Sequence, residues 1–81
     1  MLIHYGYTAA KQLISLDTST QRRIADKMKF FARQENPVLF AKYIRTQKTY
    51  RFRIGDYRIF FDIKESMICV NEISRRDKAY N

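Results

Sequence analysis

The sequence predicts one α+β domain over residues 1–81, in which an N-terminal strand and a two-helix hairpin precede a three-stranded antiparallel sheet. The chain has 81 residues, which is enough for one shared hydrophobic core and excludes a second domain. Apolar residues recur at three- and four-residue steps before Pro37 and at two-residue steps after Thr49. Because the two predicted helices are consecutive, we expect both on one face of the sheet, with the other face open.

The N-terminal segment has the pattern of a strand followed by a helix. Residues 2–7 are rich in aliphatic and aromatic side chains, which favours a strand. Thr8 is a candidate N-cap for a first helix that ends near Asp17. The apolar positions of that helix recur at helical steps: Ala9, Leu13 and Leu16.

A second, longer helix follows directly. Thr18 and Gln21 have the spacing of a capping box, and the helix is predicted to end at about Gln34. One face carries an apolar stripe: Ile24, Met28 and Phe31. Pro37 stops the helix because its ring disfavours helical geometry at the preceding residue. Residues 38–44 are predicted to form a further short helical turn.

Three strands are predicted in the C-terminal half. In residues 49–54, apolar side chains alternate with arginines, which indicates a half-buried strand. Gly55 and Asp56 supply a two-residue hairpin turn into a second strand over residues 57–63. A third strand covers residues 67–73, and a polar tail follows.

Composition narrows the class of partner. The formal net charge is +8, so the protein attracts phosphate polymers or an acidic partner. No apolar run reaches the ~20 residues that span a bilayer, and the N-terminus lacks a signal-peptide pattern, so we expect a cytoplasmic location without membrane partners. The single Cys69 lies in an apolar run and is expected to be a small buried residue.

Basic residues concentrate on one face of the predicted sheet. Residues 36–55 hold five cationic side chains and no acidic one: Lys42, Arg45, Lys48, Arg51 and Arg53. Strand alternation places Arg51 and Arg53 about 7 Å apart, opposite the apolar side. Arg58 joins them if Ile59 points to the helices. Guanidinium groups bind phosphate bidentately, but ordinary solvated arginines on an open sheet explain this spacing equally well.

Other kinds of chemistry are not indicated. The only His, His4, has no plausible metal-ligand set with Cys69, so no metal or cofactor is expected. Two glycines make no phosphate-binding loop, and neither Ser66 nor Ser74 has a nearby His partner. Nucleotide hydrolysis and acyl transfer are therefore disfavoured.

The C-terminal half resembles the signature of the RelE/ParE superfamily of bacterial toxins. The resemblance rests on Tyr50-Arg51-Phe52-Arg53-Ile54-Gly55-Asp56-Tyr57-Arg58-Ile59, then Arg75-Arg76-Asp77 and Tyr80, with Lys11-Gln12-Leu13 and Asn36-Pro37 in the helical half. It spans nearly the whole chain and implies a RelE-like fold. It also implies the toxin of a type II toxin–antitoxin system, neutralised by a cognate antitoxin protein.

Within that superfamily the resemblance allows two activities. RelE-like toxins are ribosome-dependent endoribonucleases that cut mRNA without a metal, whereas ParE-like toxins bind DNA gyrase and cut no RNA. For RNA cleavage, the implied catalytic residues are Arg51, Arg53, Arg58, Arg75 or Arg76, and Tyr80. The implied RNA-binding residues are Lys42, Arg45, Lys48 and Lys78.

Cleavage of this kind is attack by an RNA 2′-OH on the adjacent phosphate, helped by proton transfer and by surrounding cations. Strand positions that often hold Lys in the family hold Arg51 and Arg53 here. Because arginine is a poor base, we expect both to stabilise charge, and the general base stays open. Tyr80 either stacks on a nucleobase or joins proton transfer, or else anchors the tail by packing. An mRNA-cleaving toxin with ribosome and mRNA as partners is the leading interpretation. A gyrase inhibitor and a basic binding module without catalysis are the alternatives.

Overall fold

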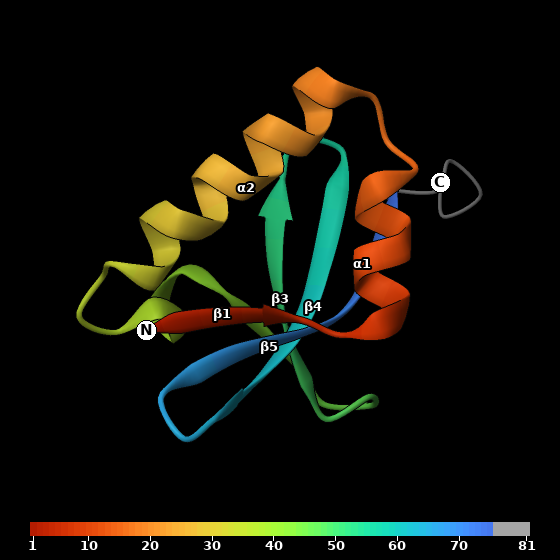
Figure 1. Ribbon diagram of the computed structural model, residues 1–81. Helices are drawn as coiled ribbons and strands as arrows, with labels where there is room; N and C mark the ends of the chain where they lie inside the picture. Colours follow the sequence, from red (N-terminus) through yellow and green to blue (C-terminus); the bar gives the residue numbers. More distant parts are fainter. Residues whose placement is uncertain (76–81) are drawn as a thin grey trace.

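The computed structural model describes residues 1–75, in which two helices pack on one face of a curved sheet (Figure 1). In chain order the elements are β1 (Leu2–Tyr5), α1 (Tyr7–Ile14), α2 (Thr18–Ala32), the 3₁₀ turn η1 (Pro37–Phe40), β2 (Lys42–Ile44), β3 (Thr49–Ile54), β4 (Tyr57–Lys64) and β5 (Met67–Arg75). The predicted α+β class is confirmed. Within the described residues, no helix is long and apolar enough to cross a membrane.

The sheet has five strands in the order β1-β5-β4-β3-β2, so the prediction of three was too small. β1 adds to one edge, parallel to β5, and makes the sheet mixed. At the other edge β2 pairs antiparallel with β3, from Lys42 opposite Arg51 to Ile44 opposite Thr49. The helical turn predicted over residues 38–44 ends at Phe40, because the chain beyond it satisfies its backbone groups on the open edge of β3.

The first helix is shorter than predicted. Its N-cap is Gly6 rather than Thr8, and no side chain caps it. It ends at Ile14, three residues before Asp17.

Asp17 is instead the N-cap of α2, so the predicted capping box at Thr18 is wrong. Its carboxylate accepts hydrogen bonds from the Ser19 hydroxyl and from both the hydroxyl and the backbone N–H of Thr20. These bonds stabilise the charged form and lower the pKa of Asp17 to about 2. The Gln21 amide donates to backbone carbonyls at the end of α1, which ties the two helices together.

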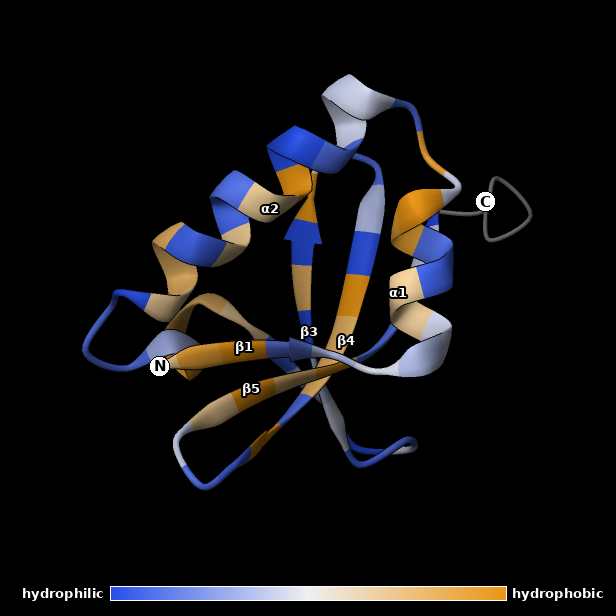
Figure 2. Cartoon of the chain, viewed as in Figure 1, coloured by the Kyte–Doolittle hydropathy of each residue, from blue (hydrophilic) through white to orange (hydrophobic). Residues whose placement is uncertain are grey.

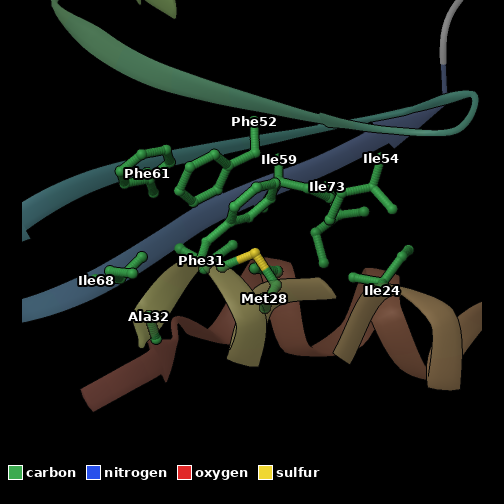
Figure 3. Close-up of a cluster of buried hydrophobic side chains, with 12 residues drawn as sticks. Ile24, Met28, Phe31, Ala32, Phe52, Ile54, Ile59, Phe61, Ile68 and Ile73 are labelled. Atoms are coloured by element: carbon green, nitrogen blue, oxygen red, sulfur yellow. The ribbon is translucent and has the colours of Figure 1, made fainter. Parts of the chain in front are cut away.

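The core forms where the apolar stripe of α2 meets the inner face of the sheet (Figure 3). The predicted stripe residues Ile24, Met28 and Phe31 are all buried. Phe52 of β3 is stacked between Phe31 and Phe61, with 4.1 Å between ring centroids on each side. Figure 2 shows the hydrophobic and hydrophilic residues alternating along β3 and β4, which turns the polar residues away from this core.

A β-bulge in β5 changes which residues reach the outer face. Phe60 pairs with Glu72, but its neighbour Phe61 pairs with Val70, so Asn71 is the extra residue. Strict alternation from the buried Val70 would have pointed Glu72 into the core. The bulge reverses that orientation, and Glu72 is exposed.

Cys69 is half-buried, so the expectation of a buried thiol is wrong. Its neighbours Ile68 and Val70 occupy the core face of β5. Period-two alternation therefore turns Cys69 to the outer side.

Candidate active site on the open face of the sheet

The face of the sheet opposite the helices holds a pocket of about 350 Å³. Strands β2 to β5 and the β2–β3 connection supply its lining residues: Ile44, Gln47, Arg51, Arg58, Phe60, Glu72, Ser74 and Arg75. We call this the arginine pocket. Three guanidinium groups from three neighbouring strands therefore surround one concave site.

Strand register explains why these side chains meet. Arg51 lies directly opposite Phe60, and Phe60 lies opposite Glu72. Arg58 lies opposite Ser74 on one side and Arg53 on the other. Directly opposed residues place their side chains on the same face, so the predicted sharing of one face by the β3 arginines and Arg58 agrees with the register.

Arg51 occupies an electrostatically unfavourable position. Its side chain is half-buried, and within residues 1–75 its Nε is buried without a hydrogen bond. Burial, and then the charges of Arg58 and Arg53, lower the pKa of Arg51 below its usual value. It still carries its charge at neutral pH. A bound anion would supply both the missing acceptor and the missing counter-charge.

Arg53 lines a different site from Arg51 and Arg58, although it lies on the same face. It is exposed and borders a second hollow, of about 470 Å³, between β3 and α2. Lys42 lies opposite Arg51 and therefore shares its face. Arg45 and Lys48 are exposed in the β2–β3 connection.

The late part of the predicted set is only partly described. Arg75, at the end of β5, lines the arginine pocket. Arg76, Lys78 and Tyr80 lie outside the described residues.

Glu72 is the pocket residue that sequence reasoning missed. Among the described residues that line the arginine pocket it is the only carboxylate. No sequence signal identified it, because its orientation depends on the bulge at Asn71, which appears only once β4 and β5 are paired. Its presence adds a proton acceptor to a site in which the sequence had indicated only cations.

The arrangement suits chemistry on a phosphodiester. Guanidinium groups bind phosphate oxygens with two parallel hydrogen bonds and stabilise the extra negative charge that develops during displacement at phosphorus. A carboxylate within the same pocket can accept a proton from an attacking hydroxyl group.

Comparison with known proteins identifies a family and a fold. Residues 3–80 match the family model described as the ParE toxin of the type II toxin–antitoxin system parDE. No curated protein sequence matches the chain. Similar solved structures include the RelBE2 toxin–antitoxin complex of Mycobacterium tuberculosis, with a TM-score of 0.78 and 19% identity over 93% of this chain and 96% of that chain.

Two archaeal structures are also similar. The RelE–RelB complex of Pyrococcus horikoshii OT3 gives a TM-score of 0.73 and 21% identity, over 95% of this chain and 96% of that one. The RelB–RelE complex of Methanococcus jannaschii gives a TM-score of 0.71 and 21% identity, over 95% of this chain and 94% of that one. At these identities the likeness confirms the expected RelE-like fold.

Proposed function

Because this chain belongs to the ParE toxin family of type II toxin–antitoxin systems, within the RelE/ParE superfamily, we propose that it is a toxin that cleaves mRNA on the ribosome without a metal ion. The observation that carries this proposal is the arginine pocket, where Arg51, Arg58 and Arg75 surround one site that also contains Glu72. A surface that bound a partner only through its charge would have no need of a carboxylate among the cations.

The proposed reaction is an internal displacement at phosphorus. The 2′-oxygen of a ribose forms a bond to its adjacent phosphorus, and Glu72 accepts the 2′-OH proton. The bond from phosphorus to the 5′-oxygen of the next nucleotide breaks, and that oxygen takes a proton from water. The products are a 2′,3′-cyclic phosphate and a 5′-OH. Arg51, Arg58 and Arg75 stabilise the added negative charge at phosphorus.

Removing the carboxylate tests the proposed base. Glu72→Gln is expected to lower the mRNA cleavage rate roughly 100-fold, in the range typical of general base catalysis, and to abolish the rise of rate with pH on the acid side. The measurement is the pH profile of cleavage in a translation extract. The matched control is Asp62→Asn, which removes a carboxylate from the same face outside the pocket.

The opposite result is equally informative. If Glu72→Gln cleaves as fast as the natural protein, or faster, then Glu72 only repels the RNA phosphate and is not the base. Asp62→Asn should keep the natural pH profile in either case.

A second function is favoured by the family match, whose description is that of ParE toxins. A gyrase inhibitor would use the same cationic face to bind its target and would cut no RNA. Mapping mRNA 5′ ends in a cell-free translation reaction, beside a gyrase supercoiling assay, separates the two. New mRNA ends with unaffected supercoiling support the proposal. Intact mRNA with lost supercoiling overturns it, and a basic binding module predicts no effect in either assay.

The proposed partners follow from this activity. The solved relatives are complexes of a toxin with its antitoxin, and we propose that a cognate antitoxin covers the basic face here with an acidic or amphipathic segment. The ribosome and mRNA are the proposed targets, which places the activity in the cytoplasm.

A further inference from the structure

A second concave site lies at the end of the β3–β4 hairpin, between that hairpin and α2. Its lining residues are Arg23, Asp26, Lys27 and Phe30 from α2, and Arg53, Ile54 and Gly55 from β3 and the turn. We call it the helix–hairpin hollow. β2 pairs with β3 only as far as Arg51, so no strand covers the edge of β3 beside the hollow.

The hollow is cationic and its cations are held by packing. Three cationic side chains and one carboxylate line it, which leaves a net charge of +2. Within residues 1–75, no hydrogen bond or ion pair occupies the guanidinium groups of Arg23 and Arg53. The Lys27 ammonium lies over the rings of Phe30 and Phe31, 4.9 and 5.5 Å from their centroids.

Gly55 fixes the position of Arg23. Its φ of +58° is a left-handed conformation that favours glycine, and a Cβ there would lie 2.7 Å from a guanidinium nitrogen of Arg23. The guanidinium group therefore rests against the backbone of the turn, at a distance that only glycine permits. Its N–H donors face the hollow in a preorganised arrangement, which lowers the cost of binding an anion.

The hollow is electrostatically continuous with the arginine pocket. Arg53 lies directly opposite Arg58, so their Cα atoms are about 5 Å apart. Its charge also contributes to the lowered pKa of Arg51. Arg53 thus joins two groups of cations that would otherwise be separate. A flexible chain with regularly spaced negative charges could contact both groups at once.

We infer that the helix–hairpin hollow is a second phosphate site, which binds a backbone phosphate of the RNA strand next to the nucleotide cut in the arginine pocket. This inference rests on the proposed function, because the strand is held in both sites. Arg23, Lys27 and Arg53 bind the flanking phosphate and fix the register of the strand. They position the substrate, whereas the arginine pocket acts on it.

The test is binding of a single-stranded RNA oligonucleotide with 2′-O-methyl groups, which cannot be cleaved. For Arg23→Gln/Lys27→Gln we expect roughly tenfold weaker binding at physiological salt. The slope of log affinity against log salt should fall by about 1.4, since each single-strand phosphate contact contributes about 0.7. The matched control, Arg22→Gln/Lys29→Gln, removes the same charge from exposed positions of the same helix outside the hollow. It should change both quantities much less.

The remaining arms decide between the alternatives. Arg23→Lys/Lys27→Arg keeps both cations and should restore most of the affinity if charge in the hollow matters. Equal losses in both Gln pairs, with each variant folded by circular dichroism, would overturn the inference in favour of diffuse attraction. Normal RNA binding by Arg23→Gln/Lys27→Gln, with weakened capture of an acidic antitoxin peptide, would assign the hollow to a protein partner. If the natural protein leaves mRNA intact in the translation extract, it is the proposed function that fails.

Discussion

The substitution Arg51→Met is expected to raise the melting temperature of the protein while removing most of its cleavage activity. The Nε of Arg51 is buried without a hydrogen bond within residues 1–75, and the charges of Arg58 and Arg53 act on it. Its pKa is therefore lower in the folded protein than in the unfolded chain. Folding consequently carries a cost at every pH below the folded-state pKa, neutral pH included.

Methionine removes that cost because it keeps an unbranched apolar stem and carries no charge. Relief of a buried, unpaired donor is worth on the order of 1 kcal/mol, which corresponds to a rise of roughly 4 °C in a domain of this size. The same change removes a cation from the phosphate in the transition state, and we expect cleavage to fall by about 10²- to 10³-fold. Stability and activity should thus change in opposite directions, as they do where a site is built for its ligand.

Two measurements on one protein preparation check this expectation: a thermal melt, and mapping of mRNA ends in a translation extract. The control is Lys64→Met, which removes an exposed cation at the end of β4, outside the arginine pocket. It should leave cleavage unchanged and shift the melting temperature little. A less stable Arg51→Met protein that still cleaves mRNA would show that Arg51 has a structural role instead.

The sequence predicted the elements whose pattern is local. Alternation in β3 correctly placed Phe52 and Ile54 in the core and the arginines outside, because a half-buried strand has a strict period of two. The stripe at Ile24, Met28 and Phe31 likewise predicted the buried face of α2.

The features that the sequence could not predict depend on pairing between distant segments. β2 is three residues long and has no periodic pattern of its own, so only the open edge of β3 makes it a strand. Glu72 reached the arginine pocket because of a bulge, which no alternation rule locates in advance. The separation of Arg53 from the pocket of Arg51 and Arg58 depends on where α2 lies against the hairpin.

The substitution Phe52→Ala is expected to have the largest effect on stability. Phe52 is fully buried, and its ring is stacked between Phe31 of α2 and Phe61 of β4. Losing a buried aromatic ring costs about 3–5 kcal/mol, from lost burial and from the cavity that remains. A domain of this length has roughly 5–10 kcal/mol of stability in total, so the variant should be largely unfolded at 37 °C.

A graded series separates packing from any direct role in catalysis. Phe52→Leu should cost less than Phe52→Ala, and Leu39→Ala, at a position that is 78% exposed, should cost little. Urea unfolding gives the ranking. Because Phe52 anchors the strand that aims Arg51 at the pocket, Phe52→Leu should still cleave mRNA at 20 °C, where it is folded, and should lose activity on warming at its own unfolding temperature. A folded Phe52→Leu protein without cleavage at 20 °C would mean that the ring also sets the geometry of the arginine pocket.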